Sequence, residues 1–118
     1  MTDPILYHNP RCSKSRGALE LLEARGIAPR VVHYLDTPPS ADELRALLSK
    51  LGYASARPLL RSGEALYQEL RLDDPALDEA ALLAAMVANP RLIERPILVV
   101  GQRAIVGRPS ERVLELLA

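Results

Sequence analysis

This chain of 118 residues contains one cysteine and neither phenylalanine nor tryptophan. A single cysteine cannot form an internal disulfide, so the disulfide framework typical of small secreted proteins is excluded. No apolar run reaches the roughly 18 residues that a membrane-spanning helix needs, and the N-terminus lacks the features of a signal peptide. We therefore expect a cytoplasmic protein with no membrane partner.

An excess of charge of one sign is also absent, because 15 Lys and Arg side chains balance 15 Asp and Glu side chains. A neutral chain has no overall attraction for nucleic acid, so we expect no nucleic-acid partner, and any small anion must be bound by local clustering. The two histidines and the cysteine lack the spacing of a zinc site, which predicts no metal. The length fits one domain over residues 1–118.

The hydrophobic pattern predicts strands that alternate with helices. Short apolar runs predict strands over residues 5–7, 31–35, 96–100 and 103–106. Helical spacing, capping residues and glycines predict helices over 13–25, 41–51 and 79–89, helical turns between 55 and 72, and a last helix opened by residues 107–111. The first two strands must be parallel and the final hairpin antiparallel. The order therefore predicts an α/β fold on a mixed four-stranded sheet with flanking helices.

The one thiol, Cys12, lies where the first strand gives way to the first helix. Helix N-termini and nearby cations favour the reactive thiolate, and the same N–H groups can hold an oxyanion. The local candidate cations are His8, Arg11, Lys14 and Arg16. A lone cysteine is most often a small buried hydrophobe, but this polar, basic setting predicts a nucleophile beside an anion site.

The neighbours of Cys12 narrow its chemistry. His8 either simply ends the strand or is an imidazolium that lowers the thiol pKa and carries a proton, and the residues leave both open. Cys12 and Ser15 form a one-thiol version of Cys-x-x-Cys, so a resolving thiol must come from another molecule. The spacing from Cys12 to Arg16 is too short for a phosphatase loop, and no Gly-rich nucleotide loop is present.

Three arginines stand out by position. Arg61 follows an apolar pair, Arg95 precedes Pro96 at the head of an apolar strand, and Arg108 stands at the start of the last helix. Guanidinium groups that converge at one end of a sheet offer the bidentate geometry that suits a tetrahedral oxyanion. The residues alone leave this convergence open, as they leave open whether the Arg95–Pro96 bond is cis.

Taken in order, these motifs resemble one family, the glutaredoxin-coupled arsenate reductases (the ArsC family), over nearly the whole chain. The resemblance rests on His8-Asn9-Pro10-x-Cys12, Ser15-Arg16, Leu59-Leu60-Arg61, Arg95-Pro96 and Gly107-Arg108-Pro109-Ser110-Glu111. It implies a thioredoxin-like fold with a helical insertion between the second and third strands. Where the best-characterised members read Cys-Gly-Thr-Ser-Arg, this chain reads Cys12-Ser13-Lys14-Ser15-Arg16, which resembles a distinct subgroup.

The resemblance also implies roles for residues. Cys12 would be the catalytic nucleophile and His8 the histidine that lowers its pKa. The oxyanion-binding residues would be Arg61, Arg95 and Arg108, with Pro96 as the cis proline and Asn9, Ser15 and Arg16 as the supporting loop. The implied activity is reduction of arsenate, or a similar oxyanion, with no bound cofactor, glutathione as co-substrate and glutaredoxin as partner.

Two other interpretations remain. The first is that the chain is a glutathione-linked monothiol oxidoreductase that acts on protein disulfides without arsenate specificity. The Spx-type transcription regulators share the scaffold and bind RNA polymerase, but they typically carry a Cys-x-x-Cys motif that this chain lacks.

Overall fold

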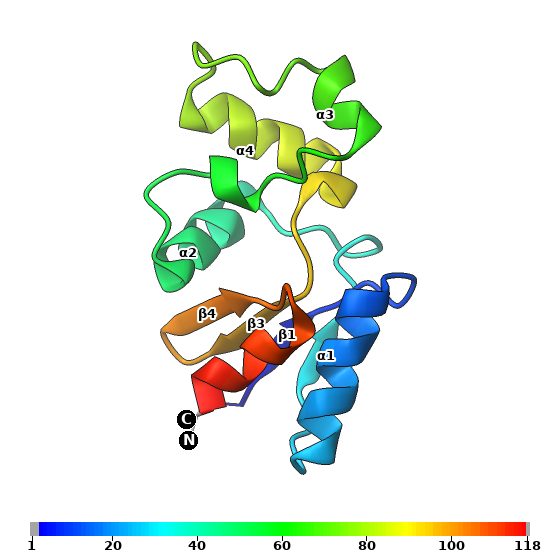
Figure 1. Cartoon of the computed structure of the whole chain (residues 1–118). Coiled ribbons are helices and arrows are strands. Elements are labelled where there is room, and N and C mark those ends of the chain that lie inside the picture. Colours follow the sequence, from blue (N-terminus) through cyan, green and yellow to red (C-terminus); the bar gives the residue numbers. More distant parts are fainter. Residues whose placement is uncertain (1–2, 118) are drawn as a thin grey trace. The chain divides into compact units, whose positions relative to one another are not determined.

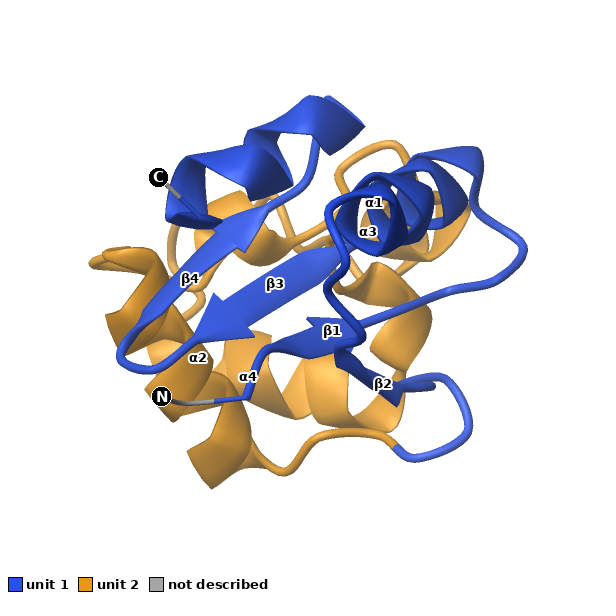
Figure 2. Ribbon diagram, turned by 90° about the horizontal axis from the view of Figure 1, so that it is seen from below, with its two compact units in different colours: residues 1–37, 95–118 blue, residues 38–94 orange. Residues whose placement is uncertain are grey.

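The computed structural model describes residues 3–117, whose strands and helices follow the predicted order (Figure 1). Residues up to Thr37 and from Arg95 onward form one unit, and Pro38–Glu94 form another (Figure 2). The first unit contains β1 (Ile5–Tyr7), α1 (Ser13–Ala24), β2 (Arg30–Val32), β3 (Ile97–Val100), β4 (Arg103–Val106) and the 3-10 helix η3 (Ser110–Leu117). The second contains α2 (Ala41–Leu51), η1 (Arg57–Leu59), α3 (Ala65–Glu69), α4 (Glu79–Ala88) and η2 (Pro90–Leu92).

The four strands of the first unit form one mixed sheet in the order β2-β1-β3-β4. Strands β1 and β2 are parallel, with Leu6 beside Val31. Strand β3 is antiparallel to β1, with Leu98 beside Leu6, and also to β4. The predicted parallel crossover and antiparallel hairpin are both confirmed.

Helices α1 and η3 pack on the face of the sheet that carries Leu6 and Leu98. Ala18 and Leu22 of α1 and Val113 of η3 complete this core, and all five side chains are fully buried. Each buried leucine contributes about 1.5–3 kcal/mol relative to an exposed one. This core fixes the axis of α1, and with it the helix N-terminus that follows Cys12.

Strand β2 is shorter than the predicted strand over residues 31–35. It ends at Val32, whose carbonyl accepts the N–H of His8 at 2.9 Å. The neighbouring strand β1 ends at Tyr7, so the backbone beyond Val32 has no strand partner and turns. The carbonyl of His33 accepts the N–H groups of Asp36 and Thr37 at 3.0 and 2.9 Å. His33 therefore lies in this turn instead of inside a strand.

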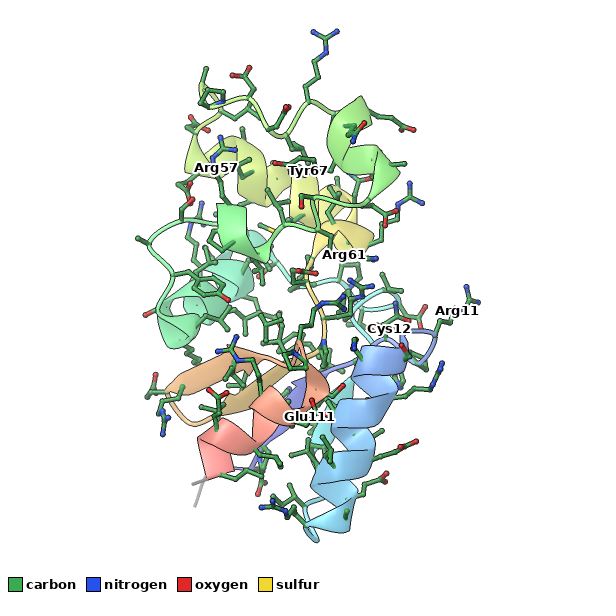
Figure 3. The ribbon with its side chains drawn as sticks, viewed as in Figure 1. Arg11, Cys12, Arg57, Arg61, Tyr67 and Glu111 are labelled. Carbon is green, nitrogen blue, oxygen red and sulfur yellow. The ribbon has the colours of Figure 1, made fainter. Side chains whose placement is uncertain are left out.

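The second unit accounts for the helix-rich middle of the sequence. Ser40 caps α2 by accepting the N–H of Glu43 at 3.1 Å, as its S-x-x-E pattern predicts. The Arg57 guanidinium (Figure 3) donates to the carbonyls of Leu72, Asp74 and Leu77 at 2.9, 2.7 and 3.4 Å, and thereby fastens an irregular loop. None of the helices within residues 3–117 has both the length and the apolar character needed to cross a bilayer.

Candidate active site

Cys12 is the N-cap residue of α1, with an extended backbone at φ −97° and ψ 124° (Figure 3). Its N–H donates to the Asn9 carbonyl at 3.0 Å, and its own carbonyl accepts the N–H of Arg16 at 3.0 Å. The side chain is partly buried and forms no disulfide. The thiol therefore stands at the positive end of a twelve-residue helix.

The pKa of the Cys12 thiol lies below its ordinary value, although burial by itself would raise it. Burial is opposed by the backbone N–H of Ser15, the charge of Arg95, the backbone N–H of Lys14 and a hydrogen bond from the Arg95 guanidinium. The sulfur makes no capping hydrogen bond of ordinary geometry, so the two N–H groups act on it mainly as dipoles. More of the thiol is consequently ionised near neutral pH, and the thiolate is the nucleophilic form.

The charge that acts on the thiol comes from a part of the chain distant in sequence. The side chains expected to supply it, those of His8, Arg11, Lys14 and Arg16, are not among the groups that lower the pKa of Cys12. Arg16 donates to the Pro10 carbonyl at 3.1 Å, and Arg11 is exposed and points away from the helix (Figure 3). Strand β3 runs antiparallel to β1, so the start of β3 lies beside the end of β1, where the loop that carries Cys12 begins. Arg95 lies just before β3 and is therefore close to this loop.

Ser15 is the centre of a buried hydrogen-bond network behind the thiol loop. Its Oγ lies 2.6 Å from Nδ1 of His8 and accepts the N–H of Asn9 at 3.0 Å. The Asn9 side chain in turn accepts the N–H of Arg11 at 3.0 Å. These bonds join the end of β1 to the first turn of α1, so Asn9 and Ser15 hold the loop that carries Cys12.

His8 is buried beside this network, and its pKa lies below 6.5 because of burial first, and then the nearby charges of His33 and Arg16. Its imidazole is therefore mostly neutral at neutral pH. A neutral ring supplies no positive charge to the thiol, so the expected imidazolium role is not the one that this geometry offers. The rings of His8 and His33 lie 6.0 Å apart, next to an open cavity of about 260 Å³ that both line.

Two of the three predicted arginines lie together at the head of β3. Nη1 of Arg108 donates to the carbonyl of Arg95 at 3.5 Å, and the Arg95 guanidinium faces Cys12. The Arg95–Pro96 peptide bond, whose isomer the sequence leaves open, is cis, and so is Arg108–Pro109. The hydrogen bond between the Arg108 guanidinium and the Arg95 carbonyl shows that the turn before β3 and the turn after β4 lie side by side.

Gly107 is required for this approach. Its N–H donates to the Pro96 carbonyl at 2.9 Å. A Cβ at this position would lie 2.8 Å from Cγ1 of Val113, closer than real contacts allow, and 3.0 Å from Cγ of Pro96, which is a tight contact. A side chain would push the turn before Arg108 away from the proline and from the core.

Arg61, the third predicted arginine, belongs to the second unit. Its N–H donates to the Leu92 carbonyl at 2.8 Å, and its guanidinium donates to the Arg91 carbonyl at 3.2 Å and pairs with Glu64 at 3.5 Å. Glu64 also pairs with Arg91 at 3.4 Å. These contacts fix Arg61 within its own unit, and its membership of an oxyanion site stays a prediction.

The arrangement favours nucleophilic chemistry by sulfur on an anion. A thiolate at a helix N-terminus stands beside a guanidinium that can neutralise an incoming oxyanion. Within residues 3–117, no group of His, Cys, Asp and Glu side chains is placed to hold a metal ion. Sequence reasoning nominated Arg95 for the anion and missed its effect on the thiol, because sheet register, which the local pattern does not reveal, sets that contact.

Comparison with known proteins identifies the family. The model of the ArsC family matches residues 7–116. An arsenate reductase of Neisseria meningitidis is 55% identical over 113 residues, which are 96% of this chain and 97% of the relative. The uncharacterized protein YfgD of Escherichia coli is 57% identical over 111 residues, covering 94% and 93% of the two chains.

The solved structure of an arsenate reductase from Vibrio cholerae superposes with a TM-score of 0.94 at 52% identity, covering 97% of each chain. This similarity confirms the predicted thioredoxin-like α/β fold with a mixed four-stranded sheet. On the family match and these identities, the chain belongs to the ArsC family.

Proposed function

We propose that this chain is a cytoplasmic arsenate reductase that uses Cys12 as its nucleophile and glutathione and glutaredoxin as its reductants. The observation that carries the proposal is the Cys12 thiol at the head of α1, with a lowered pKa and the Arg95 guanidinium beside it. The names of the relatives from Neisseria and Vibrio support arsenate as the oxyanion. A reducing compartment suits a chain whose one thiol is reactive.

In the first step the Cys12 thiolate attacks the arsenic atom of arsenate. A sulfur–arsenic bond forms, and an arsenate oxygen takes up a proton and leaves as water, so arsenic remains As(V) in a thiol-arsenate ester. Arg95 and Arg108 neutralise the oxyanion as charge shifts onto its oxygens, and the family resemblance implies the same role for Arg61. The N–H groups at the start of α1 favour the same anionic groups.

In the second step a glutathione thiolate attacks the Cys12 sulfur. The electron pair of the sulfur–arsenic bond stays on arsenic, which is reduced to As(III) and leaves as arsenite. The two sulfurs are oxidised to a protein–glutathione mixed disulfide, which glutaredoxin then reduces by thiol–disulfide exchange. The external thiols are needed because the chain has one cysteine and hence no resolving partner of its own.

His8 takes part through Ser15 in this proposal. The neutral ring and the Ser15 hydroxyl lie 2.6 Å apart, which holds the first turn of α1 so that its N–H groups face the thiolate. We therefore assign His8 to positioning of the loop, and Asn9 and Arg16 to the same support through their bonds to Ser15 and to Pro10.

The test is a coupled assay that follows NADPH oxidation with glutathione, glutathione reductase, glutaredoxin and arsenate. The unaltered chain should turn over in an arsenate-dependent way, and Cys12→Ser should lose that turnover. Ser13→Ala is the matched control, since Ser13 is an exposed neighbour in the same helix. Phosphate has the same shape and charge as arsenate but is not reducible, so it should inhibit competitively without supporting NADPH oxidation.

Arsenate turnover that survives Cys12→Ser would contradict the proposal. Thiol-dependent removal of glutathione from a glutathionylated peptide, without any arsenate turnover by the unaltered chain, would support the monothiol oxidoreductase in its place. The same preparation can be used for both assays, so inactive protein is distinguished from a different activity.

A further inference from the structure

The first turn of α1 and the start of η3 are joined by a short hydrogen bond. The Ser110 hydroxyl donates to the carbonyl of Lys14 at 2.7 Å, and Ser110 is only 8% exposed. The two helices also approach closely at this point, because a Cβ on Gly17 would lie 2.9 Å from the Ser110 Oγ. The contact therefore depends on a hydroxyl on one helix and a glycine on the other.

The carbonyl that Ser110 holds belongs to the peptide group that faces the thiol. The C=O of Lys14 and the N–H of Ser15 are two ends of one planar unit. That N–H is the leading group among those that lower the pKa of Cys12. A donor on the oxygen of a peptide fixes the orientation of its plane and strengthens its N–H as a donor, since hydrogen bonds in a chain polarise one another.

Ser110 is also connected to the other side of the thiol. It follows Arg108 by two residues, and Arg108 donates to the carbonyl of Arg95 at 3.5 Å. The Arg95 guanidinium acts on the sulfur of Cys12. The Ser110–Lys14 bond thus connects the first turn of α1 to the turn that carries Arg108, whose partner Arg95 also acts on the Cys12 sulfur.

We propose that Ser110 is a positioning residue that orients and polarises the Lys14–Ser15 peptide group toward Cys12 and holds the turn that carries Arg108. Its effect on the thiol is independent of the substrate. Its effect on oxyanion binding through Arg108 rests on the proposed function. Ser110 acts on the thiol indirectly, through its hydrogen bond to the Lys14 carbonyl.

The primary test is the pH dependence of Cys12 alkylation by iodoacetamide, which requires no arsenate. Ser110→Ala removes the donor, and the midpoint of the profile should move to higher pH. At pH 7 the rate should fall about threefold or more, since one unit in pKa is a tenfold change in the thiolate fraction of a largely protonated thiol. In the arsenate assay the same variant should raise KM more than it lowers kcat.

Gly17→Ala separates positioning from packing. With Ser110 present, the added methyl meets the hydroxyl at 2.9 Å and displaces it, so both thermal stability and alkylation rate should fall. In the Ser110→Ala background the nearest atom is the Cβ at 3.4 Å, and alanine favours a helix more than glycine does. The double variant should therefore be at least as stable as Ser110→Ala, yet alkylate as slowly, because the donor is still missing.

Glu111→Gln is the matched control, because Glu111 is the exposed neighbour of Ser110 on η3. Removing a negative charge there cannot raise the thiol pKa, so the profile should not move to higher pH.

An unshifted profile in Ser110→Ala, or recovery of both stability and alkylation rate in the double variant, would overturn the proposal. If Ser110→Ala alone does not fold, the alkylation profile of the Gly17→Ala, Ser110→Ala double variant is compared with that of the unaltered chain instead. A shifted profile in protein that never reduces arsenate would refute the proposed function while leaving this inference standing.

Discussion

The Arg95 guanidinium acts on the Cys12 thiol from the turn before β3, although the two residues lie near opposite ends of the sequence. The pairing of Tyr7 with Ile97 makes this possible, because it sets the start of β3 beside the end of β1. The pairing of strands in the sheet therefore places the Arg95 guanidinium near the thiol, and α1 supplies the helix dipole. Both favour the anionic form of the thiol.

Replacing Arg95 should move the ionisation of Cys12 toward its ordinary value. In Arg95→Gln the charge is lost, the thiol pKa should rise, and alkylation at pH 7 should slow by about three- to tenfold. At high pH the rate should be equal or slightly greater, since a more basic thiolate is more nucleophilic. Arg95→Lys keeps the charge and should keep most of the effect. The measurement is the pH–rate profile of iodoacetamide alkylation. Coincident profiles for Arg95→Gln and the unaltered chain would contradict an effect of Arg95 on the Cys12 pKa.

Ser15→Ala should destabilise the chain by about 1–3 kcal/mol, because it leaves one buried and one partly buried group without their partner. Those groups are Nδ1 of His8 and the N–H of Asn9, both of which meet the Ser15 hydroxyl. Urea unfolding measures the loss. Ser13→Ala, an exposed serine two residues earlier in the same helix, should change the free energy of unfolding by less than about 0.5 kcal/mol. Equal losses in the two variants would show that the buried network is not the cause.

The local parts of the fold could be predicted from the sequence, and the contacts between distant parts could not. Ser40 and Asp78 cap their helices as their patterns indicate, and Gly52 follows α2 as expected. The predicted strand over residues 31–35 extends beyond the end of β2 because an apolar run shows where a strand can form, whereas the length of the neighbouring strand decides where it stops. The local sequence likewise points to nearby cations for Cys12, whereas the charge that acts on the thiol is that of Arg95, which the register of β1 and β3 brings close.

The hydrogen bonds of the loop that carries Cys12 are local by comparison. Asn9, Ser15 and Cys12 lie within one short segment, so their bonds depend on local geometry that a strand, a proline turn and a helix start already define. Ser110 could not be found in this way. In the sequence it is one residue of the motif Gly107-Arg108-Pro109-Ser110-Glu111. Its partner, Lys14, belongs to a helix near the other end of the chain.

His8 should make the stability of the fold fall at mildly acid pH. Its folded pKa lies below 6.5, and an unfolded histidine titrates at about 6.5. Above that value the ring is neutral in both states and contributes no pH dependence. As the pH falls below it, the unfolded chain binds a proton that the folded chain does not, so stability decreases until the pH passes the folded pKa. His8→Gln should flatten this part of a plot of urea midpoint against pH, and an unchanged slope would exclude His8 as its source.

Arg57→Lys should loosen the irregular loop of the second unit. The guanidinium satisfies the carbonyls of Leu72, Asp74 and Leu77 at once, and an ammonium group cannot reach three acceptors with the same planar fork. We expect faster amide hydrogen exchange over residues 70–78 and a loss of about 1–3 kcal/mol, the cost of leaving a partly buried acceptor unpaired. Arg45→Lys is the control, because its ion pair with Asp42 is exposed and should contribute under about 1 kcal/mol. Unchanged exchange in Arg57→Lys would show that the loop is held by its backbone turns alone.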